Sequence, residues 1–152
     1  MKLFFCFNGT YEGDGKAGEG SIAGKGGIGP EEHPKFAFRT EAAAIRFRSK
    51  VDPNNDHDKN NYPNFYYNIG SATVKGNPSQ VFEVIAHIDD CTMHFDIYAS
   101  KAEATARAAK EKSNMLKKIR ELFDGEGGEG DEEDCDVLME VLPIEVLDEY
   151  ID

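Results

Sequence analysis

The sequence predicts an α+β protein, in which an antiparallel sheet is packed by one long helix at about residues 100–123. Apolar and polar residues alternate over residues 81–98, which is the period of a half-buried strand. A segment rich in Ala, Lys, Glu and Leu follows at once, and these are strong helix formers. The length of 152 residues suits one domain with appendages, here a Gly-rich loop and an acidic C-terminal tail.

The first third of the chain predicts two strands, a loop between them and a short helix. Residues 2–7 are an apolar run typical of a buried strand. Residues 9–30 contain nine glycines and predict a flexible loop. Residues 35–39 predict a second strand, which enters a short helix capped by the Thr40 hydroxyl.

Two strands within residues 82–97 are expected to form a hairpin with its turn at Asp90 and Cys91. The expected cross-strand pairs are Ile88 with Met93, His87 with His94, Ala86 with Phe95, and Val84 with Ile97. This register places the apolar residues on one face of the hairpin and both histidines on the other.

The long helix has a start signal, an apolar stripe and a stop signal. Ser100 and Glu103 form the S-x-x-E pattern of a capping box, and Gly125 suits the end of the helix. The stripe at helical spacing consists of Ala104, Ala108, Met115, Ile119 and Leu122. We expect the small alanines to let the helix approach the sheet closely.

Charge divides the chain into a near-neutral body and an acidic tail. All 17 Lys and Arg precede residue 121, and they face 16 acids within residues 1–123. Residues 124–152 carry 13 acids and no base. We therefore expect a single domain over 1–123, an acidic Gly/Asp/Glu linker over 124–136, and a short acidic amphipathic segment over 137–152. Within that segment, residues 137–142 predict a strand, and Pro143 predicts the start of a short helix that ends near Tyr150.

Composition favours a cytoplasmic protein without a cofactor. The three cysteines are odd in number and far apart, which argues against a disulfide or zinc framework. The apolar start is too short for a secretory signal. No stretch approaches the roughly 20 apolar residues that span a bilayer, so we expect no membrane partner.

One constellation suits catalysis or metal binding. In the expected register His87 lies opposite His94, with Asp89 and Asp96 one step along. Two imidazoles and two carboxylates at this distance suit a divalent metal or acid–base chemistry. The other interpretation is a polar sheet face, and we favour it; a metal-dependent hydrolase using His87 and His94 ranks third among the functions.

Basic and aromatic residues interleave twice, in K-F-A-F-R and in R-F-R-S-K. Such a pattern on an exposed surface suits single-stranded nucleic acid, through base stacking and phosphate contacts. Alternation in a half-buried element gives the same pattern. The candidate nucleic-acid-binding residues are Lys35, Arg39, Arg46, Arg48 and Lys50.

A partial family resemblance adds Lys101 to these candidates. The residues Gly76-Asn77-Pro78, then Phe82 and Val84, then Ser100-Lys101-Ala102-Glu103-Ala104, resemble the second half of a double-stranded-RNA-binding domain. The resemblance covers about residues 63–120. It implies that Ser100 and Lys101 grip a phosphate at the helix N-terminus. Ala102 and Thr105 depart from it, because they stand where that family has lysines.

The acidic tail leads to the preferred function: a non-catalytic cytosolic binding or regulatory protein whose tail contacts a protein partner, such as a component of nucleic-acid machinery. A phage-type inhibitor or nucleic-acid mimic is one form of this hypothesis. The candidate partner-binding residues are Glu132, Glu133, Asp134, Asp136, Leu147 and Tyr150. The alternative is a nucleic-acid-binding protein, of the single-stranded or double-stranded RNA type, that is autoinhibited by the tail.

Overall fold

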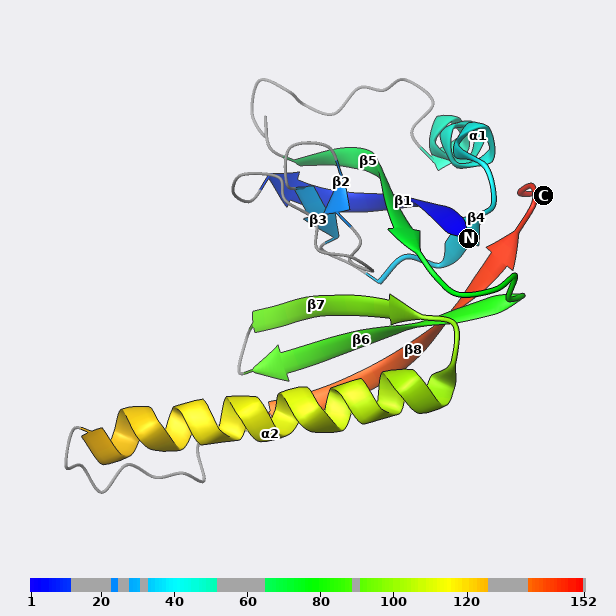
Figure 1. Ribbon diagram of the computed structural model, residues 1–152. Helices are drawn as coiled ribbons and strands as arrows, with labels where there is room; N and C mark the ends of the chain where they lie inside the picture. The colour runs from blue at the N-terminus through cyan, green and yellow to red at the C-terminus, as the bar shows by residue number, and fades with distance from the viewer. Residues whose placement is uncertain are drawn as a thin grey trace.

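The computed structural model describes residues 1–11, 23–24, 28–30, 33–51, 65–88, 91–125 and 137–151. These residues form one mixed sheet and two helices, so the predicted α+β class is confirmed (Figure 1). The elements are β1 (Lys2–Tyr11), β2 (Ala23–Gly24), β3 (Ile28–Pro30), β4 (Phe36–Phe38), α1 (Glu41–Val51), β5 (Phe65–Thr73), β6 (Gln80–Ile88), β7 (Cys91–Tyr98), α2 (Lys101–Gly125) and β8 (Val137–Leu147).

The sequence predicts an antiparallel sheet, but the sheet is mixed, because β8 pairs with one parallel and one antiparallel strand. The strand order is β2-β5-β1-β4-β8-β6-β7, with β3 paired to β1. β8 is antiparallel to β6 and parallel to β4. The last strand along the chain therefore lies in the interior of the sheet and joins its two parts (Figure 1).

The short helix expected from Pro143 to near Tyr150 is wrong. Residues 137–147 form a single strand whose Ile144 and Val146 side chains are buried. Three of its eleven residues are Val and one is Ile, and such β-branched residues pack well on a pleated surface. Burial in the sheet therefore outweighs the helical start signal of Pro143.

Pro143 is tolerated in β8 because, among the described residues, the strand has only one strand neighbour at that point. On one side Pro143 pairs with Phe82 of β6. On the other side β4 begins at Phe36, which lies opposite Glu145. The missing N–H of Pro143 therefore costs no bond to β4. Its carbonyl oxygen accepts a hydrogen bond from His33 Nε2 at 3.1 Å.

Apolar side chains pack in three clusters. The largest draws on strands from both parts of the curved sheet and consists of Leu3, Phe5, Phe7, Ala37, Ala72, Val74, Val81, Ile97, Ile144 and Val146. A second lies beneath α1 and centres on Phe38, Ala43 and Ala44. A third lies between β6 and α2 and centres on Val84, Ala104 and Ala108. β6 is consequently buried on both of its faces.

The hairpin of β6 and β7 exists, but its predicted register is wrong. Ile88 pairs with Cys91, His87 with Thr92, and Ile85 with His94. A β-bulge lies between the pairs Glu83–Ile97 and Ile85–His94, where β7 advances by one residue more than β6. Because side chains alternate along a strand, the extra residue moves Ile97 to the face that carries Glu83 and Ile85, where His94 also lies.

Both helices begin with side-chain caps at the predicted positions. The amide of Ala43 donates to Thr40 Oγ1 at 3.2 Å, and the amide of Glu103 donates to Ser100 Oγ at 3.4 Å. Neither helix in the described residues has the length and apolar character needed to cross a membrane.

The Gly-rich segment is partly strand. Gly9–Tyr11 belong to β1 and pair with β3, which is Ile28–Pro30, and β2 also falls within the segment expected as a loop. Residues 12–22 and 25–27 lie outside the described residues, as do residues 126–136 of the acidic linker.

Candidate functional site

Helix α1 and strand β4 present cations beside aromatic rings. We call this group the α1 surface; it consists of Phe36, Arg39, Arg46, Phe47 and Lys50. The rings of Phe36 and Phe47 meet edge to face, with centroids 5.7 Å apart and planes at 83°. Thr40 directly follows the interleaved sequence K-F-A-F-R and caps α1, and the turn at this point brings the second interleaved sequence against the first.

Residues 148–150, which we call the clasp, contact this surface directly after β8. Asp148 Oδ1 accepts from Arg39 Nη1 at 3.2 Å. Glu149 accepts two hydrogen bonds from Arg46, one of them from Nε to Oε2 at 3.1 Å. The Lys50 Nζ atom lies 5.1 Å from the centroid of the Tyr150 ring and donates to the Tyr150 carbonyl oxygen at 3.5 Å.

Tyr150 is the aromatic member of the clasp. Its ring centroid lies 5.6 Å from that of Phe36 and 4.9 Å from that of Phe47. It thus belongs to an aromatic group that also contains Phe36, Phe38 and Phe47. Pairs with this geometry contribute about 0.5–1.5 kcal/mol each beyond their buried area.

The ion pairs of the clasp are exposed and so contribute little to stability. The exposed fractions are 83% for Asp148, 47% for Glu149 and 55% for Arg46. Exposed pairs contribute roughly 0–1 kcal/mol and weaken with salt. Arg39 differs, because it also donates to Asn77 Oδ1 at 3.1 Å and to the Pro78 carbonyl oxygen at 3.3 Å. Arg39 therefore also holds the loop before β6 in place.

The other predicted nucleic-acid-binding cations are dispersed. Lys35 is exposed before β4, and Arg48 is half-buried on α1. Lys101 begins α2, which lies at the other end of the molecule from α1 (Figure 1). The structure therefore brings together Arg39, Arg46 and Lys50, but not Lys101.

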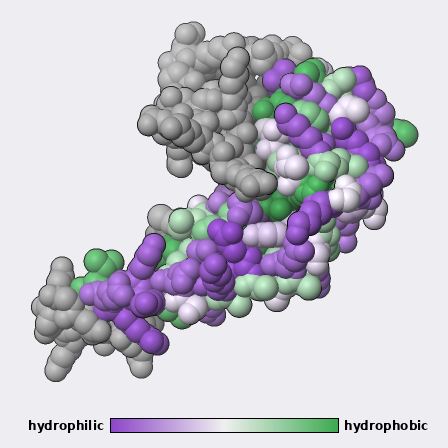
Figure 2. All heavy atoms as spheres, viewed as in Figure 1, coloured by the Kyte–Doolittle hydropathy of each residue, from purple (hydrophilic) through white to green (hydrophobic). Residues whose placement is uncertain are grey.

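Helix α2 also carries exposed cations. Lys110, Lys117 and Arg120 are spaced i, i+7, i+10, which places them on one face of the helix, and all three are exposed. Figure 2 shows hydrophilic residues gathered along α2. Arg107 of the same helix is partly buried, and its Nη1 atom donates to Asp96 Oδ2 at 2.7 Å and to Tyr98 Oη at 3.1 Å.

A buried polar cluster lies on the opposite face of β6 from α2. Glu83 is fully buried, and its Oε1 atom lies 2.9 Å from His33 Nδ1 and 3.1 Å from His94 Nδ1. His33 precedes β4, Glu83 lies on β6 and His94 lies on β7, so three segments meet at one carboxylate. His94 pairs with Ile85, two residues from Glu83 along β6, so its side chain lies on the same face of the hairpin as Glu83.

Geometry fixes the charge of His33. Its two ring nitrogens face a carboxylate oxygen and the Pro143 carbonyl oxygen, both of which accept, so both nitrogens must donate. Burial opposes that charge, but the bonds to Glu83 and Pro143 and the carboxylates of Glu83 and Glu140 raise the pKa of His33 above its usual value. For Glu83, burial is likewise outweighed: hydrogen bonds from His33 and His94 lower the pKa of this carboxyl group.

The catalytic and metal site expected from the sequence is not assembled. His87 Nδ1 lies 3.3 Å from Thr92 Oγ1 and its Nε2 lies 3.4 Å from Glu140 Oε2, away from the expected partner His94. Asp96 pairs with Arg107, and Asp89 lies outside the described residues. Across the described part of the chain, no group of three or more His, Cys, Asp or Glu is arranged to hold a metal ion.

Two atoms of the buried cluster have no hydrogen-bond partner among the described residues: Glu83 Oε2 and His94 Nε2. Sequence reasoning named His94 but missed His33 and Glu83. An available signal was a lone acid within the apolar run of β6, because an acid with buried neighbours on both sides needs a partner. No sequence pattern identifies His33, fifty positions earlier, as that partner.

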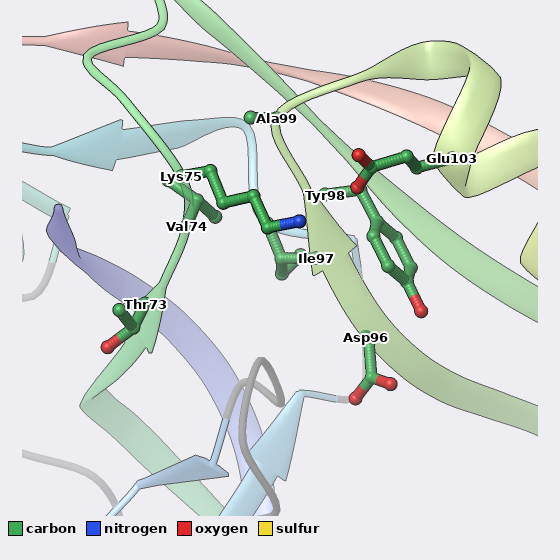
Figure 3. Close-up of a pocket in the computed structure, with 8 residues that line it drawn as sticks. All are labelled: Thr73, Val74, Lys75, Asp96, Ile97, Tyr98, Ala99 and Glu103. Carbon is green, nitrogen blue, oxygen red and sulfur yellow. The ribbon is translucent and has the colours of Figure 1, made fainter.

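A pocket of about 350 Å³ opens between the end of β5, strand β7 and the start of α2 (Figure 3). Its lining residues are Thr73, Val74, Lys75, Asp96, Ile97, Tyr98, Ala99 and Glu103. Lysine and carboxylate side chains both line it, so its charge selects no single class of ligand.

The predicted partner-binding residues fall into two groups. Glu132, Glu133, Asp134 and Asp136 lie outside the described residues. Leu147 and Tyr150 pack against the aromatic cluster beneath α1 and so contact the body of the same chain. No family model, curated protein or solved structure matches the chain, so the resemblance to double-stranded-RNA-binding domains gains no support and the function is inferred from geometry.

Proposed function

We propose that this protein binds nucleic acid without catalysis, through the α1 surface, and that its acidic C-terminal residues compete for that surface. One observation carries the proposal: each of the three clasp residues engages a cation or ring that the sequence marks as a nucleic-acid contact. Arginines beside aromatic rings suit phosphates and bases, and here Arg46 is exposed and Arg39 half-buried. Asp148 and Glu149 contact the same guanidinium groups and so compete with the phosphates of a bound nucleic acid.

The protein-partner hypothesis is less well supported by the geometry. Its apolar anchors, Leu147 and Tyr150, are packed into the protein itself. A partner that uses them has to displace the end of β8. The acidic linker remains a candidate partner surface, and the same experiment addresses it.

An enzyme is also less well supported. Glu83 is fully buried, and the unpartnered His94 Nε2 atom has no exposed surface either. A general acid or base must reach its substrate within hydrogen-bond distance. The ion pair of His33 and Glu83 is accounted for by its role in linking segments of the sheet.

The test uses substitutions that neutralise the carboxylates instead of truncation, because removing residues 124–152 removes β8 from between β4 and β6. The variant is Asp148→Asn with Glu149→Gln. The matched control is Glu103→Gln with Glu121→Gln, which changes the net charge equally on the exposed face of α2. Binding of fluorescent single- and double-stranded DNA and RNA is measured across a salt series.

We expect the clasp variant to bind roughly tenfold more tightly than the wild type at low salt, with a difference that shrinks as salt rises. The control should gain much less. Arg46→Gln in the clasp variant should remove the gain. If no nucleic acid binds any variant, the proposal is wrong, and the acidic residues should next serve as bait for a protein partner. Equal gains in variant and control would show that net charge alone acts, which also contradicts a defined surface.

A further inference from the structure

We infer that the ligand of the α1 surface is single-stranded nucleic acid, and that the clasp imitates one of its nucleotides together with a neighbouring phosphate: the Tyr150 ring lies where a base binds, and the Asp148 and Glu149 carboxylates lie where phosphates bind. The inference rests on the proposed function and deepens it. It assigns a role to each clasp residue, which competition by charge alone does not require.

The aromatic part of this site is a corner that fits one ring. Phe36 and Phe47 stand almost perpendicular, at 83°, and Tyr150 lies against both, tilted by 50° from Phe36 and by 69° from Phe47. Lys50 lies over the same ring. A nucleobase has a π face and edge of the same kind, so it can make tilted contacts with both rings and a cation–π contact with Lys50.

The charged part of this site has the chemistry of phosphate recognition. Arg46 contacts Glu149 with two nitrogens, and this fork matches a phosphate as well as a carboxylate. Arg39 offers a second guanidinium to the preceding residue, Asp148. The two carboxylates of the clasp therefore contact two arginines, and the Tyr150 ring that follows them in sequence contacts the rings of Phe36 and Phe47.

This arrangement excludes a duplex as the preferred ligand. In a double helix each base is stacked on both faces and paired along its edge, so no base can enter a corner between two phenylalanine rings without leaving the stack. A single strand presents unstacked bases at little cost.

The experiment separates base recognition from anion binding by using three probes on the full chain: a fluorescent oligo(dT), a duplex of the same length, and inorganic polyphosphate. The variants are Tyr150→Leu, which removes the ring and keeps an apolar side chain, and Asp148→Asn with Glu149→Gln. We expect Tyr150→Leu to bind oligo(dT) roughly five- to tenfold more tightly than the wild type, with polyphosphate binding unchanged. The double variant Asp148→Asn with Glu149→Gln, which lacks both carboxylates, should gain affinity for oligo(dT) and for polyphosphate.

A second measurement serves if Tyr150→Leu lowers the thermal unfolding midpoint too far for binding assays. In the wild type, oligo(dT) should displace the Tyr150 ring, so its proton resonances should move toward those of an exposed tyrosine at saturation. Ring resonances that stay in place at saturation contradict the inference.

The outcomes distinguish the two proposals. If polyphosphate and oligo(dT) bind equally and Tyr150→Leu changes neither, an anion-binding surface stands and the inference of a single-stranded ligand is wrong. Tighter binding of the duplex than of oligo(dT) also contradicts the inference of a single-stranded ligand. If none of the probes binds any variant, both proposals are wrong.

Discussion

The Nδ1 atom of His33 lies 2.9 Å from the Oε1 atom of Glu83, a carboxylate with no exposed surface. The two residues are fifty positions apart, and the same imidazole also donates to the Pro143 carbonyl oxygen. One charged side chain thus joins the segment before β4 to both β6 and β8. We therefore expect the free energy of unfolding to depend on the ion pair of His33 with Glu83.

Replacing Glu83 with alanine should destabilise the protein strongly. The substitution leaves the His33 charge half-buried without its partner and removes the acceptor of His94. Breaking a buried pair in this way costs roughly 3–5 kcal/mol in the free energy of unfolding, measured by urea denaturation. The control is Glu145→Ala, an exposed glutamate on β8, which should cost about 0.5 kcal/mol or less. Similar losses in both variants would contradict a structural ion pair.

The free energy of unfolding should be greatest at mildly acidic pH. The pKa of His33 is raised above 6.5, so its contribution is fully present below pH 6.5 and is lost as pH rises through the folded-state pKa. The pKa of Glu83 is lowered from 4.5, so its contribution is present above pH 4.5 and is lost as pH falls through the folded-state pKa. The contribution of the pair is therefore largest between pH 4.5 and pH 6.5.

Urea denaturation at a series of pH values checks this prediction. The substitution His33→Gln removes the titrating group and should flatten the decline on the alkaline side. His87→Gln is the control, because His87 lies outside the buried cluster, and it should leave that decline in place. If the decline persists in His33→Gln, another group is responsible for it.

Arg107 should stabilise the packing of α2 against β7. Its guanidinium contacts Asp96 and Tyr98 of β7 and Glu111 of α2. Lysine cannot reproduce this set of planar contacts. Because the side chain is partly exposed, we expect Arg107→Lys to lower the free energy of unfolding by roughly 1–2 kcal/mol. Lys110→Arg, on the exposed face, should change it by less than about 0.5 kcal/mol; equal effects would remove Arg107 from this role.

The close approach of α2 to β6 should depend on Ala104. This residue is fully buried in the cluster with Val84 and Ala108. The larger side chain of Ala104→Leu has no space there, so the substitution should cost roughly 1–3 kcal/mol. Ala102→Leu makes the same change two residues earlier, on the exposed face, and should be nearly neutral. Thermal unfolding compares the two variants, and a neutral Ala104→Leu would mean that the helix is loosely packed.

Local patterns predicted the features that depend on neighbours in sequence. The caps at Thr40 and Ser100 follow from hydroxyl groups placed before helix-forming residues. The α+β class follows from periodicity. The interior position of β8 does not, because Pro143 gives a helix start signal, and only the late start of β4 opposite β8 makes the proline acceptable in a strand.

The candidate sites show the same division. Interleaved cations and aromatic residues marked Arg39 and Arg46, since that pattern is local. The wrong pairing of His87 with His94 arose because β7 is displaced by two residues from the expected register near the turn, and alternation cannot distinguish the two registers, since a shift of two residues leaves every side chain on its face. Contacts between positions far apart, such as His33 with Glu83 or Arg46 with Glu149, have no local signature.

The interior position of β8 also dictates how the chain must assemble. Strands β2, β5, β1 and β4 lie on one side of it, and β6 and β7 lie on the other. The two sides become one sheet only after residue 147 has been synthesised, and the contact of Phe36 with Glu145 closes a loop of more than a hundred residues. Such non-local pairing makes folding slow. Until β8 inserts, the edges of β4 and β6 are open to other chains, so exchange of β8 between two copies is the misassembly that this topology favours.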